Sequence, residues 1–225
     1  MHDNFNFFIL GAVAVIIIAA LIYYYYFSPY AAAKRMLFKS IQKNIFSVEN
    51  GETAKVTGTI KYIGSPLIAP LSGRKCVYYQ VVVEEKKSTG KSSYWDTIID
   101  EELAANVVIR DGNSYALIET NMIKSLLMYD KKYKSGFLND ATPELEKYLS
   151  KYGFKSTSSF LGINNTLRYK EGILEEGEMI AVVGKGAWKR KSEIKFDIPF
   201  EKILVIGHID DKIPVFLSDD PASLQ

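Results

Sequence analysis

One uncharged stretch near the N-terminus constrains this chain more than any other feature. The sequence carries no formal charge between Asp3 and Lys34, and residues 7–27 (FFILGAVAVIIIAALIYYYYF) are nearly all apolar. At about 1.5 Å per helical residue, this stretch is about 30 Å long, which matches the hydrocarbon core of a bilayer. The sequence therefore predicts a transmembrane helix.

A cleaved signal peptide is the alternative interpretation of the same stretch. The sequence Ala31-Ala32-Ala33 resembles a cleavage site. However, the apolar stretch is longer than the core of a signal peptide, and no lysine or arginine precedes it.

The residues that flank the apolar stretch predict where it meets the membrane surface and which way it runs. Tyrosine combines an apolar ring with a hydroxyl group that needs water, so tyrosines favour the headgroup level. Basic residues follow the stretch and none precedes it, which predicts an external N-terminus and a cytoplasmic C-terminal part in a single-pass protein. The predicted membrane-interface residues are Tyr23, Tyr24, Tyr25, Tyr26, Lys34 and Arg35.

Residues 31–46 (AAAKRMLFKSIQKNIF) have the pattern of a second helix, and Pro29 predicts a break before it. A basic amphipathic helix can lie on an anionic lipid surface. It can equally be a plain connector between the apolar stretch and the rest of the chain, and the pattern leaves both interpretations open.

From residue 52 onward the pattern changes to β-branched and aromatic runs separated by turns. Hairpins are predicted at residues 76–100 and 106–119, and strands at 167–189, 193–199 and 202–208. One helix is predicted after Thr142, with Pro143 at its first position and Gly153 after its end.

The predicted fold class is mainly β (α+β), with an N-terminal transmembrane helix followed by an antiparallel, barrel-like or two-sheet domain that carries one or two inserted helices. A barrel-like or two-sheet arrangement is favoured because closure hides strand edges. The predicted divisions are a transmembrane anchor at 1–30, a juxtamembrane helix or linker at 31–50, the β domain at 51–217 and a flexible tail at 218–225.

The composition argues against most catalytic and metal chemistry. The chain has one cysteine, Cys76, and two histidines, His2 and His208, whereas a structural zinc site needs four such ligands. Cys76 begins an apolar strand and is predicted to be a core residue, and His208 is predicted to end a strand before a turn. We therefore predict no catalytic residue, no metal site and no cofactor.

The charge distribution gives only local basic features. A net charge of +2 does not favour a nucleic-acid partner. Gly184 and Gly186 lie before a basic run at 189–191, but strands on both sides exclude a phosphate-binding loop. This run and the turn at 86–91 are predicted to be hairpin tips, which either touch anionic headgroups or a partner, or are simply solvated.

A longer pattern resembles a known family. PLIAPLSGRKCVYYQVVVEE at 66–85 is followed by Trp95, by NVVIRDGNSYALI at 106–118 and by RYKEGILEEGEMIAVVG at 168–184. The order and spacing over roughly residues 52–187 resemble the GIDE domain of Mulan-type membrane-anchored E3 ubiquitin ligases, which also occurs in uncharacterised bacterial and archaeal membrane proteins. The matching positions are Pro66, Leu67, Pro70, Leu71, Ser72, Gly73, Arg74, Cys76, Val77, Tyr78, Tyr79, Glu84, Trp95, Asp111, Gly112, Glu171, Leu174, Gly177, Glu178 and Gly184.

The resemblance implies a membrane-adjacent domain but not a ligase activity. The ligases bind two zinc ions in a RING through about eight Cys and His ligands, and this sequence has one cysteine. Ubiquitin-like ligation would therefore need a separate RING subunit.

The sequence predicts a membrane-anchored, GIDE-like protein-binding or scaffold module, with the lipid bilayer and a protein as its partners. Alternatives are a component of a ubiquitin-like ligation system and an anionic-lipid-binding module. The loop 65–74 is the predicted binding surface because two prolines keep it out of a sheet, and closing the barrel is its alternative role. The predicted binding residues are Pro66, Leu67, Pro70, Leu71, Ser72 and Arg74.

Overall fold

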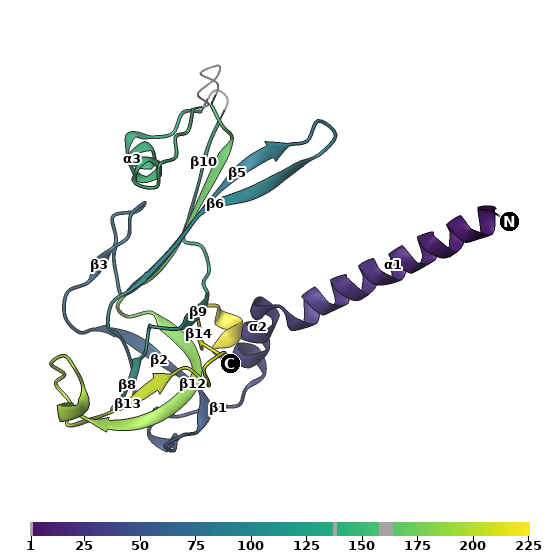
Figure 1. The fold of residues 1–225 in the computed structure, drawn as a ribbon. Coiled ribbons are helices and arrows are strands. Elements are labelled where there is room, and N and C mark those ends of the chain that lie inside the picture. The colour runs from purple at the N-terminus through teal and green to yellow at the C-terminus, as the bar shows by residue number, and fades with distance from the viewer. Residues whose placement is uncertain (1, 137–138, 158–163) are drawn as a thin grey trace.

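The structure is a computed structural model that describes residues 2–136, 139–157 and 164–225. It combines an N-terminal helical arm with two β assemblies that lie one above the other in Figure 1. The helices are α1 (His2–Phe27), α2 (Pro29–Lys39) and α3 (Pro143–Lys151). The strands are β1 (Gln42–Lys43), β2 (Thr53–Tyr62), β3 (Leu67–Ile68), β4 (Lys75–Cys76), β5 (Tyr78–Ser88), β6 (Ser93–Ala104), β7 (Val107–Asp111), β8 (Ser114–Ile118), β9 (Ile123–Leu126), β10 (Lys131–Ser135), β11 (Leu167–Leu174), β12 (Met179–Arg190), β13 (Lys202–Gly207) and β14 (Val215–Ser218).

The lower assembly is a closed ring of strands. β2, β7, β8, β13 and β12 pair in that order, and β12 pairs back to β2, so the ring has no open edge. Numbered along the chain, the ring strands follow the order 1-2-3-5-4, and the third and fifth are parallel. This is the strand order of an OB-fold barrel, so the structure contains the barrel that was one of the two predicted arrangements.

Alternation along the ring strands explains the barrel core. Successive side chains of a strand point to opposite faces. Val56 and Ile60 on β2, and Val107 and Ile109 on β7, are fully buried inside the ring. Every second residue of these strands is apolar, so one face of each strand packs into the barrel.

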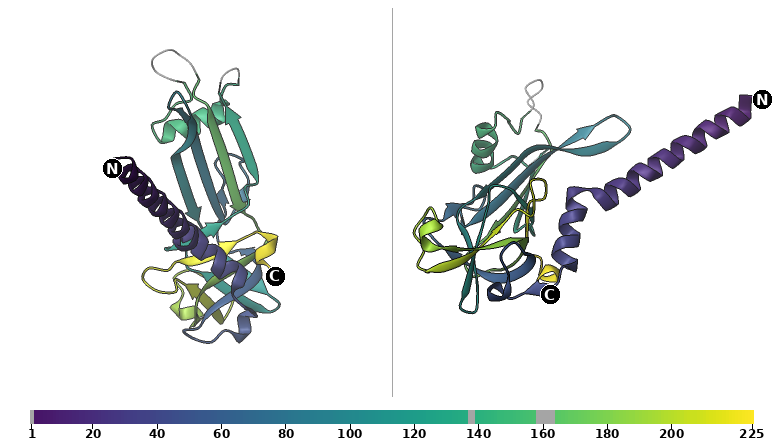
Figure 2. Two further views of the ribbon diagram at one scale, coloured as in Figure 1. Left: turned by 90° about the vertical axis from the view of Figure 1, so that its right-hand side faces the viewer. Right: turned by 60° about the horizontal axis from the view of Figure 1, so that its bottom comes forward.

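The upper assembly is a four-stranded antiparallel sheet in the order β10-β11-β5-β6. It is made from two segments that are inserted between ring strands at distant points of the chain. The first insertion, between β2 and β7, supplies β5 and β6, and the second, between β8 and β12, supplies β10 and β11. The left view of Figure 2 shows these strands standing above the barrel.

Helix α3 covers one face of the upper sheet. Leu145, Tyr148 and Leu149 pack against a buried cluster that includes Val81 and Tyr169. Thr142 caps the helix by accepting a hydrogen bond from Leu145 N, and Pro143 occupies its first turn. This helix and its cap were predicted from the sequence and are confirmed.

Two predictions about strands are wrong. The domain is not purely antiparallel, because β1–β2, β13–β8 and β14–β9 are parallel pairs. Residues 193–199 do not form a strand and instead follow a 3-10 turn at Lys191–Glu193. The apolar side chains of Ile194, Phe196 and Ile198 pack against the outside of the barrel, so their alternation reflects burial of a loop.

The predicted transmembrane helix, which is part of the predicted fold class, is not supported. α1 is helical, but in the part of the chain that the structure describes no helix has the length and hydropathy needed to cross a membrane. The membrane location and the orientation stay predictions.

The α1–α2 boundary is at the predicted proline. α1 ends at Phe27, and Ser28 caps α2 by accepting a hydrogen bond of 3.2 Å from Ala31 N. Proline lacks the N–H that a continuing helix would need. α2 ends at Lys39 and is therefore shorter than the predicted helix at 31–46.

Barrel closure predicts a low tolerance for side chains at Gly184 on β12. A Cβ atom there would lie 2.5 Å from Ile206 Cγ2 and 2.6 Å from the Gly207 carbonyl oxygen. We expect Gly184→Ala to lower the free energy of unfolding by about 1–3 kcal/mol, because both neighbours belong to the packed barrel wall. Urea unfolding followed by tryptophan fluorescence measures this. Gly11→Ala is the matched control, since no atom lies within 4 Å of its added Cβ, and an equal effect of both variants would contradict the prediction.

Candidate functional site around helix α2

Helix α2 is held against the barrel by a small apolar face. Ala33 and Leu37, one helical turn apart, are fully buried. They pack against Ala181 and Val183 of β12 and against Phe216 of β14. These residues fix one side of α2, and the basic residues Lys34, Arg35 and Lys39 stay exposed on the rest of its surface.

Five basic residues lie on or beside α2, and we refer to them as the basic collar: Lys34, Arg35, Lys39, Lys124 and Lys212. The first three come from α2, Lys124 comes from β9, and Lys212 lies in the turn before β14. Lys34, Arg35, Lys39 and Lys212 are exposed, and Lys124 is half-buried. The collar therefore joins residues that lie almost 180 positions apart in the sequence.

A cavity of about 520 Å³ lies where α1 meets α2. Its lining includes Tyr25, Tyr26, Lys34, Arg35 and Phe38. The rings of Tyr25 and Tyr26 meet edge to face, with centroids 5.3 Å apart. Arg35 donates a hydrogen bond to the Tyr26 carbonyl oxygen, and the Lys34 ammonium lies 5.9 Å from the Phe38 ring centroid. The cavity thus combines aromatic surface with the positive charges of Lys34, Arg35 and Lys39.

A second cavity, of about 340 Å³, lies on the other side of α2. Met36, Pro214 and Phe216 give it an apolar lining, and Arg35 and Lys124 contribute positive charge. Arg35 contributes to both cavities. An elongated ligand with an anionic head and an apolar body has the complementary chemistry.

The structure brings together four of the six predicted membrane-interface residues, because Tyr25, Tyr26, Lys34 and Arg35 line the same cavity. Tyr23 lies further along α1 with 68% of its surface exposed. The side chain of Tyr24 lies outside the described residues.

Sequence reasoning missed the collar residues that come from outside α2. Lys124 and Lys212 are isolated lysines in short strand and turn segments, and no local pattern marks them. Only the packing of α2 against β14 and β9 brings them beside Arg35.

The six predicted binding residues lie elsewhere, at the junction of the barrel and the upper sheet, and all of them are partly buried. Leu67 and Leu71 pack against the core of the upper sheet. The backbone N–H groups of Leu71 and Ser72 donate to Oε2 of Glu171, at 2.7 and 3.3 Å. Glu171 is fully buried, so its carboxylate attaches the loop to strand β11.

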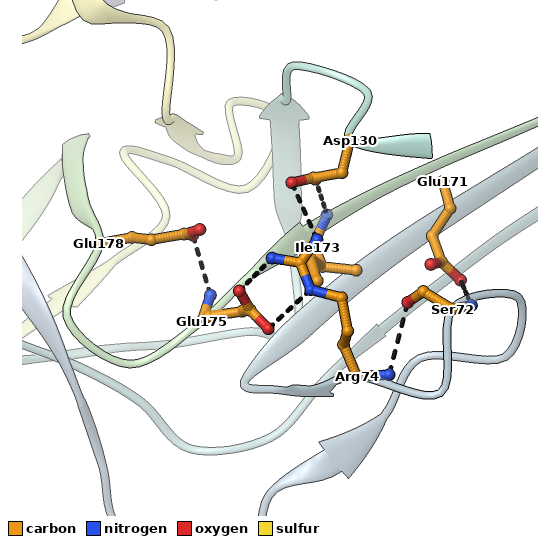
Figure 3. A network of polar contacts seen from close by, with 7 residues as sticks. All are labelled: Ser72, Arg74, Asp130, Glu171, Ile173, Glu175 and Glu178. Carbon is orange, nitrogen blue, oxygen red and sulfur yellow. Dashed lines mark hydrogen bonds and ion pairs between the residues drawn. The ribbon is translucent and has the colours of Figure 1, made fainter. Parts of the chain in front are cut away.

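Arg74 is the second attachment point of this loop, as Figure 3 shows. Its guanidinium group forms two hydrogen bonds with Glu175, of which Nε–Oε1 measures 3.0 Å, and Nη1 lies 3.4 Å from Asp130 Oδ1. The pairing with Glu175 raises the pKa of Arg74. Asp130 Oδ2 also accepts a hydrogen bond from Ile173 N. The loop 65–74 is therefore held in place by two sets of internal contacts, one to Glu171 and one from Arg74 to Glu175 and Asp130.

Cys76 lies beside this network as a buried thiol. Burial raises its pKa to about 11, and the carboxylates of Glu171 and Glu175 add to the rise. The protonated thiol is a poor nucleophile. In the described part of the chain, no group of three or more His, Cys, Asp or Glu side chains is arranged to hold a metal ion.

Comparison with known proteins gives no relative. No family model, no curated protein and no solved structure matches the chain.

The Glu171 contacts predict that this carboxylate stabilises the loop. We expect Glu171→Ala to lower the free energy of unfolding by about 1–3 kcal/mol, because two partly buried backbone N–H groups lose their acceptor. Trypsin should also cleave faster after Arg74. Glu176→Ala is the control, since Glu176 is exposed on the turn that follows β11. Unchanged cleavage after Arg74 in Glu171→Ala would contradict this role.

The C-terminal segment contains a carboxyl group with a raised pKa. Asp219 Oδ1 accepts a hydrogen bond of 2.8 Å from Met128 N. Burial raises the pKa of Asp219 from 3.8 to about 6, and the carboxylates of Asp130 and Asp220 add to the rise. Its contribution to stability is therefore complete below about pH 4 and is lost as the pH rises through about 6.

We expect Asp219→Asn to unfold at a higher temperature than the wild type near neutral pH, because the amide cannot ionise. The difference should disappear at about pH 3, below the unfolded-state pKa, where the wild-type carboxyl group is mostly protonated in both the folded and unfolded states. Thermal unfolding measured across this pH range tests the prediction. The exposed Asp211→Asn is the control, and a pH-independent difference for Asp219→Asn would count against it.

Proposed function

We propose that the protein is an anionic-lipid-binding module whose basic collar contacts the headgroups of a membrane surface. The observation that supports this most directly is the cavity of about 520 Å³ that Tyr25, Tyr26, Lys34, Arg35 and Phe38 line. Aromatic rings with polar tips and basic side chains are the residues that favour the headgroup region. The proposal assigns the collar to the membrane surface and requires no crossing of the bilayer.

The apolar surface of α1 supports the same proposal. Ile16, Ile17 and Leu21 are each more than half exposed. Figure 1 shows α1 extending away from both β assemblies. A contiguous exposed apolar surface of this kind marks a site of protein or membrane contact. The cations at the base of α1 favour an anionic lipid surface over an apolar protein surface.

The contribution of the collar charges to the affinity for anionic vesicles can be stated as a free energy. A basic residue near an anionic leaflet contributes about 1 kcal/mol, and this contribution decreases with salt. Removing three collar charges should therefore weaken binding to anionic vesicles by roughly a hundredfold.

Vesicle flotation of the full chain tests this proposal. We expect stronger flotation with vesicles that contain phosphatidylserine than with vesicles of phosphatidylcholine alone. The triple variant Lys34→Gln, Arg35→Gln, Lys39→Gln should lose this difference and retain its binding to the neutral vesicles.

The matched control carries the same change of charge outside the collar, at the exposed residues Lys75, Lys155 and Lys195. Equal flotation of the wild type with both kinds of vesicle, or an equal loss in the control variant, would overturn the proposal.

A protein-binding or scaffold role is the second candidate, and one observation favours it. The upper sheet has two edge strands, β6 and β10, and both carry charged residues. Helix α3 covers only one face of this sheet, so within the described residues the other face and the two edges are open to a protein partner. The resemblance to the GIDE domain, and a ligation role beside a separate RING subunit, stay predictions.

A further inference from the structure

The two edges of the upper sheet carry opposite charges. β6 forms one edge and contains Asp96, Asp100, Glu101 and Glu102. β10 forms the other edge and contains Lys131, Lys132 and Lys134. Among the residues that the structure describes, no strand pairs with the outer side of either edge. An open edge offers unpaired N–H and C=O groups to another chain.

The hydrogen bonds of β5 show which residues of β6 face outward. Lys86 N donates to Thr166 O on the β11 side, at 2.9 Å, and Thr89 N donates to Ser92 O on the β6 side, at 2.9 Å. Backbone groups alternate between the two neighbouring strands, so odd-numbered residues of β5 face β6. Their register partners below the bulge are Ile99, Glu101 and Leu103. The backbone groups of Asp100 and Glu102 therefore point outward.

The side chains of these two acidic residues lie on the face that α3 leaves open. Glu101 points the other way, because its Oε2 accepts a hydrogen bond of 2.7 Å from Tyr148 of α3. Gln80 Nε2 donates to Asp100 Oδ1 at 3.1 Å and to Glu102 Oε1 at 3.0 Å. Gln80 thus holds both carboxylates side by side on the open face.

The same reasoning applies to β10. Tyr133 pairs with Tyr169 and packs toward the α3 side. Its neighbours Lys132 and Lys134 therefore lie on the open face. Asn139 Nδ2 donates to the Lys134 carbonyl oxygen at 2.6 Å from outside the ladder, which shows that the Lys134 backbone faces outward. The backbone groups of Lys132, two residues earlier in the same strand, therefore also face outward.

The strand directions make these two edges compatible with each other. Adjacent strands alternate in direction across the sheet, and the number of strands is even, so β6 and β10 are antiparallel. A second copy shifted sideways would bring its β10 beside β6 in an antiparallel pair with the open faces aligned. Followed across the sheet, the level of Lys132 is that of Asp100, so a displacement of the copies by two residues along the strands places Lys132 opposite Glu102 and Lys134 opposite Asp100. Opposite charges in directly facing positions stabilise such a pair.

We propose that copies of this chain associate edge to edge, with β6 of one copy paired to β10 of the next. Pairing β6 with β6 would place carboxylates against carboxylates, and pairing β10 with β10 would place lysines against lysines, and both arrangements are unfavourable. The contact is therefore heterologous, and it forms a ring or a row of copies on a surface.

Two features limit the number of residues that can pair between β6 and β10 of neighbouring copies. β6 has a bulge where the register shifts between Val83 and Glu84 of β5, and Asn139 occupies the Lys134 carbonyl oxygen. Bulges and covered edge groups limit strand pairing between molecules. The association is therefore reversible and depends on protein concentration and on salt.

A charge-swap experiment tests the proposal with the full chain in a mild detergent. One variant is Asp100→Lys, Glu102→Lys, and the other is Lys132→Glu, Lys134→Glu. Two differently tagged copies are mixed, and their co-purification and chemical crosslinking are measured. Wild-type copies should associate, and each variant alone should lose most of this association because its two edges then carry like charges.

Mixing the two variants should restore association, because each variant again meets an edge of opposite charge. Circular dichroism checks that both variants fold. Lys86→Glu, Lys91→Glu, with Lys86 near the end of β5 and Lys91 in the turn that follows, is the control with the same change of charge as the lysine variant, and it should associate like the wild type. Association of each variant alone at the wild-type level, or two folded variants whose mixture does not associate, would overturn the proposal.

Discussion

The pairing of β2 with β12 is the interaction on which the remaining architecture depends. Residues 53–59 of β2 pair with residues 179–185 of β12 and close the ring of strands. The same β12 presents Ala181 and Val183 on its outer side, where Ala33 and Leu37 of α2 pack. Closure therefore both completes the barrel core and fixes the helix that carries the collar. Without this pairing, β2 and β12 would be open edges of a sheet.

Closure also explains how one sheet can be built from two distant insertions. The first insertion leaves the barrel after β2, and the second returns to it at β12. Because β2 and β12 are neighbours, β5 and β11 emerge side by side and pair from Tyr78–Leu174 to Glu85–Leu167. The Glu171 and Arg74 contacts then attach the loop 65–74 at the junction. This loop is thus part of the connection between the two assemblies, whereas the surfaces proposed for binding lie around α2 and along the edges of the upper sheet.

Much of the local structure could be predicted from short patterns. The hairpin of β7 and β8 follows from alternation around the Asp111-Gly112-Asn113 turn, where Gly112 has a φ of 57°. Helix α3 follows from its Thr142 cap and its proline at the first turn. Residues 193–199 were assigned to a strand wrongly, because alternating burial of a loop against the barrel gives the same period of two.

The sequence by itself determined the helices, the hairpins, the buried character of Cys76 and the concentration of basic residues after α1, because each depends on neighbours a few positions apart. Only the tertiary structure decided the parallel pairing of β8 with β13, the meeting of Lys124 and Lys212 with Arg35, and the opposite charges of the two sheet edges. These features join residues that lie far apart along the chain. Their positions are set by which strands close the barrel, and no local periodicity encodes that choice.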